Sequence, residues 1–184
     1  MKLIVGLGNP GLQYSKTRHN VGFLFLDYLQ EQLSFPEFLE KSKFKAFISE
    51  GFIDGQKVIL AKPNTFMNLS GEAILALVNF YNLDIKKDLC IVFDDIDLNF
   101  GKIRFKDDGG PGTHNGMRDI VLRIGSKSFA RLRFGIEHEQ RVMSLSDFVL
   151  SRFADEEFLE LNKVFKEVFV LLSDKFLDFS KKTD

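Results

Sequence analysis

The chain has 184 residues, of which 45% are hydrophobic and 28% are charged, and its formal net charge is −1. The only cysteine, Cys90, excludes a disulfide within the chain, and its apolar neighbours favour a core residue over a nucleophile. No apolar run reaches the roughly 18 residues of a membrane-spanning helix, and no signal peptide precedes the first apolar run. We therefore expect a cytoplasmic soluble protein of one domain, large enough to bury a core.

The charged residues are distributed unevenly along the chain. Residues 102–141 hold nine basic and five acidic residues, a net charge of +4, whereas the rest of the chain carries −5. Basic and apolar residues alternate over 102–106 and again over 131–134, so each run would place its basic side chains on one face of a strand. A solvated face explains one such strand. Two of them, together with Arg118 and Arg123, favour a surface that binds phosphates.

The first 22 residues predict a strand, a loop and a helix entry, and the loop has the spacing Gly6-x-Gly8-x-x-Gly11 of a dinucleotide-binding fingerprint. Asn9-Pro10-Gly11 is typical of a turn instead, because proline has no N–H to donate and forces the preceding residue into an extended conformation. Helical spacing begins only at Val21, too late for a helix N-terminus to face a pyrophosphate. We favour a loop that carries polar groups for chemistry over a structural turn, and both over a dinucleotide site.

Helical and β-like periodicities alternate along the rest of the chain. Apolar spacing predicts helices over residues 21–33, 72–82, about 117–124, 144–152 and 155–179. Alternating or continuous apolar runs predict strands over residues 3–5, 44–53, 57–62, 89–93, 102–106 and 129–136. Asp54-Gly55 is a strong hairpin signal between two of these strands, and residues 34–43 are expected to form a connector. The last helix is amphipathic, which indicates packing against a sheet.

Polar and glycine residues beside these helices are expected to cap them. Asn20 is the natural N-cap of the first helix, and either Asn68 or Ser70 could cap the second. Gly125 is expected to end the helix that reaches Ile124.

Residues 89–93 are apolar on both strand faces, the pattern of a central parallel strand, and they lead into Asp94-Asp95-Ile96-Asp97. Ligands of open α/β sheets gather beyond the carboxyl ends of the strands, so we expect Asp94, nearest the strand end, to be functional. A solvated turn is the alternative. A calcium loop is excluded, because Phe100 and Lys106 stand where such a loop needs glycine and its closing glutamate.

Six polar residues at predicted loop tips are candidates for chemistry: Asn9, His19, Asn68, Asp94, His114 and Asn115. Neither H-E-x-x-H, nor paired cysteine ligands, nor G-x-S-x-G occurs, so zinc and serine hydrolase mechanisms lack their usual residues. A carboxylate bonded to one imidazole nitrogen leaves the other free to accept a proton from water. Asparagine amides can donate to a carbonyl oxygen that gains negative charge. The inventory favours attack of water on an ester or amide, without a metal, a cofactor or a covalent intermediate.

Six motifs in order give the chain its resemblance to bacterial-type peptidyl-tRNA hydrolases. They are GLGNPGLQY at 6–14, TRHNVG at 17–22, KPNTFMNLSG at 62–71, DDIDL at 94–98, GGPGTHNGMR at 109–118 and RLRFGI at 131–136. The likeness runs from the N-terminus to about residue 175. Six ordered motifs are far more specific than any one of them.

The resemblance implies a monomeric single-domain α/β fold over residues 1–184, with a mixed, largely parallel twisted sheet and helices on both faces. It implies cleavage of the ester between a peptide and the 3′ end of tRNA, which frees the tRNA for reuse in translation. His19 would be the general base and Asp94 its orienting partner. The residues that would bind substrate are Asn9, Tyr14, Met67, Asn68 and Asn115. Lys106 and Arg133 would meet the tRNA phosphates, without metal or cofactor.

The sequence also departs from the family. Thr113 stands where a glycine usually precedes the His-Asn pair, and Asp95 stands where another acidic residue follows the catalytic aspartate. The Gly-Ile-x-His-Pro-Gly stretch continues here as Glu137-His138-Glu139-Gln140, which removes an expected lysine and leaves Arg141 as the nearby substitute. These changes bear on tRNA affinity more than on catalysis.

Two other classes of function compete with the hydrolase. An RNA-binding module without activity would use the same basic strands, yet it would need neither His19 nor Asp94. A nucleotide-dependent oxidoreductase would rest on the three glycines of the first loop alone. Salt-dependent binding without hydrolysis would indicate the first alternative, and a change of NADH fluorescence would indicate the second.

Overall fold

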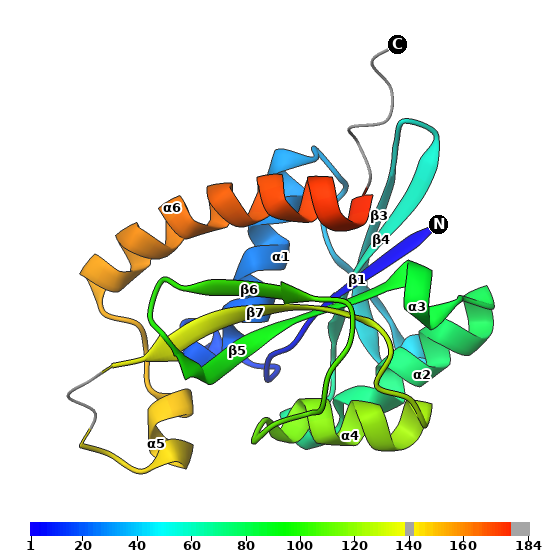
Figure 1. Cartoon of the computed structure of the whole chain (residues 1–184). Coiled ribbons are helices and arrows are strands. Elements are labelled where there is room, and N and C mark those ends of the chain that lie inside the picture. The colour runs from blue at the N-terminus through cyan, green and yellow to red at the C-terminus, as the bar shows by residue number, and fades with distance from the viewer. Residues whose placement is uncertain (139–141, 178–184) are drawn as a thin grey trace.

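A computed structural model describes residues 1–138 and 142–177, and they form one twisted seven-stranded sheet (Figure 1). The strands are β1 (Lys2–Gly6), β2 (Leu39–Lys41), β3 (Ala46–Ile53), β4 (Gln56–Pro63), β5 (Leu89–Asn99), β6 (Ile103–Lys106) and β7 (Ala130–Glu137). Their order is β2-β3-β4-β1-β5-β7-β6. The central strands β4, β1, β5 and β7 pair in parallel, and β2, β3 and β6 add antiparallel edges. The predicted mixed, largely parallel sheet is confirmed.

Helices cover both faces of the sheet, as the resemblance implied. The helices are α1 (Val21–Gln32), α2 (Ser70–Tyr81), α3 (Ile85–Asp88), α4 (Asn115–Ile124), α5 (Leu145–Leu150) and α6 (Asp155–Leu172). Figure 1 shows α1 and α6 on one side of the sheet and α2 and α4 on the other. Within the described residues, no helix combines the length and the hydropathy needed to cross a bilayer.

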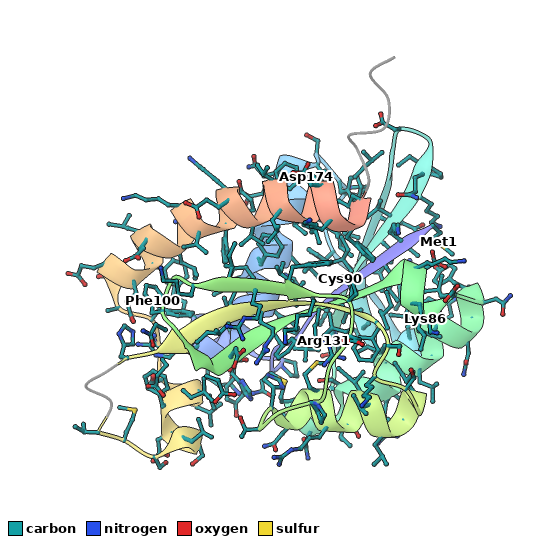
Figure 2. The ribbon with its side chains drawn as sticks, viewed as in Figure 1. Met1, Lys86, Cys90, Phe100, Arg131 and Asp174 are labelled. Atoms are coloured by element: carbon teal, nitrogen blue, oxygen red, sulfur yellow. The ribbon has the colours of Figure 1, made fainter. Side chains whose placement is uncertain are left out.

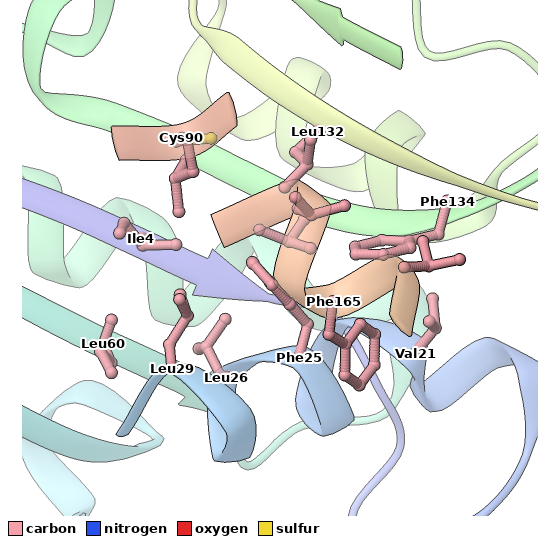
Figure 3. Close-up of a cluster of buried hydrophobic side chains, with 14 of the residues drawn as sticks. Ile4, Val21, Phe25, Leu26, Leu29, Leu60, Cys90, Leu132, Phe134 and Phe165 are labelled. Carbon is pink, nitrogen blue, oxygen red and sulfur yellow. The ribbon is translucent and has the colours of Figure 1, made fainter. Parts of the chain in front are cut away.

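The central strands contribute to two cores because successive side chains point to opposite faces. Ile4 and Cys90 pack with Phe25 of α1 and Phe165 of α6, as Figure 3 shows. The neighbouring residue Ile91 packs instead with α2 and α4. Burial on both faces explains why these strands are continuous apolar runs. Burial also raises the pKa of the Cys90 thiol, in line with the predicted core role.

Glycines bring the start of α1 against the end of β1. A side chain on Gly6 would place its Cβ 2.3 Å from the carbonyl oxygen of Gly22, and one on Gly22 would place it 2.5 Å from the backbone nitrogen of Leu7. Both distances are far inside van der Waals contact. Gly11, at φ 109°, leads into a short 3-10 turn over Leu12–Tyr14, whereas α1 begins only at Val21. These glycines therefore serve a helix-to-strand contact and a turn.

Several boundaries differ from the prediction. β5 does not end at Phe93 but continues to Asn99, because its polar second half keeps pairing with β7 after a register shift beyond Asp95. β2 lies in the expected connector, and α3 was not predicted. α6 ends at Leu172 and is followed by a π-helical turn, Ser173–Leu177, whereas the last part of the predicted helix lies outside the described residues.

The hairpin and the end of α4 follow the prediction, but the helix N-caps do not. Asp54 and Gly55 have φ 49° and 78°, as a tight two-residue hairpin requires, and Gly125 ends α4 at φ 71°. The Asn20 side chain does not cap α1, because it is engaged with the backbone of Asn9. α2 begins without a side-chain cap, so the prediction of Asn68 or Ser70 as its cap was wrong.

Candidate active site

The site forms at the edge of the sheet where the parallel strands β1 and β5 have their carboxyl ends. The segment after β1 carries His19 in a 3-10 turn, Arg18–Asn20, and β5 carries Asp94. His19 Nδ1 lies 2.8 Å from Asp94 Oδ1 and 2.9 Å from Oδ2. The two side chains are 10% and 3% exposed. Since Nδ1 faces a carboxylate, it carries the proton, and Nε2 keeps its lone pair.

A second imidazole binds the same carboxylate. His114 Nε2 lies 3.0 Å from Asp94 Oδ1, and His114 Nδ1 accepts from the backbone N–H of Met117 at 3.2 Å. The latter bond also caps α4. Because Nδ1 is an acceptor, the neutral ring carries its proton on Nε2 and donates it to Asp94. The rings of His19 and His114 lie 4.9 Å apart between centroids.

The three groups shift one another's pKa values. Burial acts to lower the pKa of His19, but the charge of Asp94 and its hydrogen bond outweigh burial and raise it above its ordinary value. Burial acts to raise the pKa of Asp94, yet the two imidazoles hold it well below its usual range. Burial dominates at His114 and lowers its pKa despite Asp94. The shifts therefore favour the ionised form of Asp94, and they favour a proton on His19 over one on His114.

His19, Asp94 and His114 also have the ligand types of a metal site, with their candidate atoms within 4.8 Å of one another. The hydrogen bonds argue against that use. A metal on His114 Nε2 would require the ring proton on Nδ1, where it would face the N–H of Met117. Metal-bound histidine instead donates its second N–H to an acceptor. The three side chains therefore fit a carboxylate that accepts hydrogen bonds from two imidazoles better than they fit a metal site.

The pair opens on a cavity of about 530 Å³. The cavity lies between the glycine-rich loop before α4 and the helix α5, and its wall includes His19, Asp94, Asp95, Asn115, Arg118, Arg133, Leu145, Ser146 and Val149. Among the described residues, His19 Nε2 has no hydrogen-bond partner. A water or substrate atom in the cavity can therefore reach the basic nitrogen.

Asn9 is fixed beside this site from two directions. Its backbone nitrogen donates to Asn20 Oδ1 at 2.9 Å, and its carbonyl oxygen accepts from Asn20 Nδ2 at 2.9 Å. Its own side chain accepts from the backbone N–H of Met67 at 2.8 Å through Oδ1. Asn9 is 7% exposed and lines a second cavity of about 450 Å³. The side-chain NH2 group is thus the part of Asn9 left to bind a ligand.

The other predicted substrate residues differ in exposure and in whether they line a cavity. Met67 is buried, and a Cβ on Gly116 would lie 2.7 Å from its sulfur, so Met67 packs under the first turn of α4 and lines neither cavity. Asn68, next in the chain, is exposed. Asn115 is exposed and lines the catalytic cavity. Tyr14 is half-buried in the loop after β1.

The predicted phosphate-binding residues lie on one face of the sheet, but in different settings. β6 and β7 pair with Arg104 opposite Arg133 and Lys106 opposite Arg131, which confirms that the basic residues of the two strands share a face. Arg133 forms an ion pair with Asp95 and lines the catalytic cavity. Lys106 is exposed outside that cavity.

Arg131 has a structural role that the sequence did not indicate. It is 1% exposed and donates to the carbonyl oxygens of Gly110 at 2.8 Å and Lys127 at 2.9 Å. Figure 2 shows it between the sheet and α4. Burial and the neighbouring Arg133 lower the pKa of Arg131. It therefore holds the glycine-rich loop and is not available to RNA.

Of the departures from the family pattern, Thr113 is exposed beside His114 and lines the catalytic cavity. Glu139, Gln140 and Arg141 lie outside the described residues. Sequence reasoning missed the contacts that His114 and Asn20 make in the site, although His114 was a loop-tip candidate and Asn20 was predicted as a helix cap. A histidine three residues before a backbone N–H at a helix start was the available signal for its capping bond.

Fold and site together define an α/β protein with a histidine–aspartate pair facing a cavity at the carboxyl edge of its parallel strands. Residues 3–182 match the protein family described as peptidyl-tRNA hydrolase. A peptidyl-tRNA hydrolase of Fusobacterium nucleatum is 44% identical over 168 residues, 91% of this chain and 85% of the relative. One of Chloroflexus aurantiacus is 48% identical over 159 residues, 85% of this chain and 82% of the relative.

A solved structure agrees with these sequence matches. The crystal structure of peptidyl-tRNA hydrolase from Acinetobacter baumannii superposes with a TM-score of 0.84 at 36% identity, covering 95% of this chain and 90% of that one. The chain belongs to the peptidyl-tRNA hydrolase family.

Proposed function

We propose that the chain hydrolyses the ester between a peptide, or an N-blocked amino acid, and tRNA, with His19 as the general base. Family membership supports the substrate class. The observation that carries the mechanism is the bond of His19 Nδ1 to Asp94 Oδ1 at 2.8 Å in a ring that lines the cavity. The carboxylate selects the tautomer whose Nε2 can accept a proton.

In the proposed reaction, His19 Nε2 takes a proton from water while the water oxygen attacks the ester carbonyl. The oxyanion that forms is stabilised by side-chain amide donors. When the C–O bond to the ribose breaks, the proton passes from His19 to the leaving oxygen. The products are tRNA with a free terminal hydroxyl and a peptide carboxylic acid, which then releases its proton to solvent. Asp94 stays ionised and stabilises the imidazolium that exists between the two transfers.

The substrate contacts follow from the same arrangement. Asn9 is buried and held by the backbone of Met67, Asn115 lines the cavity, and Asn68 is exposed. We assign these three to the peptide backbone or the scissile carbonyl. We assign Met67 and Tyr14 to the substrate on the resemblance alone, Met67 to the peptide side and Tyr14 to the 3′-terminal nucleotide.

The tRNA body is assigned to the basic face that carries Lys106 and Arg133. The proposed unit is a monomer of one domain that acts in the cytoplasm, without metal or cofactor, and returns tRNA to translation.

The test compares the wild type with His19→Ala on an N-blocked aminoacyl-tRNA, with and without chelator. Loss of the base is expected to lower kcat by about 10²- to 10⁴-fold, while tRNA affinity and the circular dichroism spectrum are retained. Chelator should leave the wild type unchanged. Near-normal turnover by His19→Ala would refute the mechanism, and tRNA binding without hydrolysis by the wild type would favour an RNA-binding module.

A further inference from the structure

A single carboxylate beside the catalytic pair joins three segments of the chain. Glu157, in the first turn of α6, accepts from Arg18 Nη1 at 2.8 Å and from Nη2 at 2.9 Å. It also accepts from the backbone N–H of Ala154 at 2.6 Å, and its Oε1 lies 2.5 Å from His138 Nε2. Burial acts to raise the pKa of Glu157, but these donors outweigh it, so the pKa falls below its usual value. Glu157 is therefore held as an ion.

Arg18 connects this carboxylate to the residue next to it, His19. The Arg18 backbone N–H donates to the carbonyl oxygen of Ser151 at 3.0 Å, and Nε donates to Ser151 Oγ at 3.2 Å. The guanidinium carbon lies 4.7 Å from the ring centroid of Phe148 and 5.0 Å from that of Phe153. The Arg18 side chain is 9% exposed. The position of Arg18 is thus set by contacts with two aromatic rings, by one ion pair and by two hydrogen bonds.

The same contacts hold one wall of the catalytic cavity. α5 contributes Leu145, Ser146 and Val149 to that wall. α5 follows β7, whose end is next to His138, and it precedes Ala154. Both His138 and Ala154 donate to Glu157. The segment that carries the wall is therefore attached at each end to the carboxylate that binds Arg18.

We propose that Arg18 and Glu157 are positioning residues, which keep the His19 imidazole aligned on Asp94 and hold α5 across the cavity from it. The inference rests on the proposed role of His19 as the base. Neither residue touches the reacting atoms. A buried ion pair adds little net stability compared with an apolar pair of the same shape, so geometry is the gain that this pair offers.

The test uses Glu157→Gln, Arg18→Met and the double variant. Glutamine keeps the size of the side chain, and methionine keeps packing between the two phenylalanine rings. The titratable groups that face His19 are Asp94 and His114. In each variant, kcat is expected to fall by about 10- to 100-fold with KM changed less than about twofold, as expected for a small misplacement of a reacting group. The double variant should lose no more than either single variant.

The His19 pKa, measured by NMR titration of the substrate-free protein, separates positioning from charge. If the contacts position His19, both single variants loosen its bond to Asp94 and both lower its pKa. If only long-range charge matters, Glu157→Gln lowers the pKa and Arg18→Met raises it. This readout needs no turnover, so it judges the inference even if His19 proves not to be the base.

The matched control is Glu50→Gln, which removes the carboxylate of the ion pair with Lys57 on the β3–β4 hairpin. It should change neither kcat nor the His19 pKa. Opposite pKa shifts in the two single variants would overturn the proposal. So would variants that melt at lower temperature but keep the wild-type kcat and His19 pKa.

Discussion

Asp94 acts on two imidazoles with opposite results. Both His19 and His114 line the cavity, yet the pKa of His19 is raised and that of His114 is lowered. The difference follows from what each ring offers besides Asp94. His114 uses its second nitrogen to accept an N–H, so a proton there would face a donor. In the proposed mechanism, Asp94 thus supports His19 as the base and is itself oriented by the hydrogen bond from His114.

The variant Asp94→Asn, which replaces one carboxylate oxygen by an NH2 group, tests the role of Asp94 toward His19. His114 donates to Oδ1, so the asparagine would keep its oxygen there and put its NH2 group in place of Oδ2, 2.9 Å from His19 Nδ1, which favours the His19 tautomer with the proton on Nε2. A comparable change in a serine protease lowers kcat by about 10⁴-fold, and we expect a loss of at least about 10²-fold here. The measurement is kcat on N-blocked aminoacyl-tRNA.

The same variant predicts the direction of a pH shift. The proposed mechanism needs neutral His19, so kcat should rise with pH through the His19 pKa, which lies above the ordinary value of about 6.5 in the wild type. Without the Asp94 charge, burial lowers that pKa unopposed, and the midpoint of the kcat profile should move to lower pH. Asp97→Asn, on the same cavity wall, is the control and should not move it. A shift to higher pH would contradict the assignment.

At the scale of elements, the sequence predicted turns and helix ends, which depend on local residue types. It did not predict which segments pair as strands. Asp54, Gly55 and Gly125 have positive φ, a conformation that their residue types favour and that the sequence therefore predicts. β2 has three exposed residues, so nothing but its pairing with β3 makes it a strand. The second half of β5 is polar and continues only because β7 lies beside it.

The site residues likewise divide into those that sequence motifs predicted and those whose contacts depend on the fold. Motifs pointed to His19 and Asp94, and the structure brings them into contact although they are 75 positions apart. The bond of Arg18 to Glu157 spans 139 positions, and neither residue has a local pattern that marks a partner. The prediction of Asn20 as a helix cap was wrong for a related reason. The Asn20 side chain bonds to the backbone of Asn9, 11 positions away, and not to its own helix.

Arg131→Met tests how the glycine-rich loop is held. The loop is rich in glycine, yet Arg131 donates hydrogen bonds to the carbonyl oxygens of Gly110 in the loop and of Lys127 after α4. Loss of these bonds, at about 1 kcal/mol each, should speed amide exchange over residues 109–113 by about tenfold or more. KM should rise, since the loop forms a wall of the cavity. Arg104→Met, on the exposed edge strand, is the control, and equal exchange in both variants would refute the role.

Across the whole molecule, the positive charge available to RNA is smaller than the sequence total suggests. Arg131 holds a loop, Arg133 is paired with Asp95, and Arg123 is paired with Asp119 and Glu72. Lys106 is exposed, and no ion pair to it occurs among the described residues. A free cation releases counterions from RNA in full, whereas a paired one must first leave its partner.

Lys106→Ala should therefore reduce the salt dependence of tRNA binding more than Arg133→Ala does. Each neutralised phosphate contributes about 0.7 to 0.9 to the slope of log K against log salt concentration, so Lys106→Ala should lower the slope by about that amount. Affinity is measured over a salt series in the His19→Ala background, which binds without turnover. Lys163→Ala, on the exposed side of α6 across the sheet, is the control. A larger slope change for Arg133→Ala would contradict this expectation. It would mean that a tRNA phosphate replaces Asp95 as the ion-pair partner of Arg133.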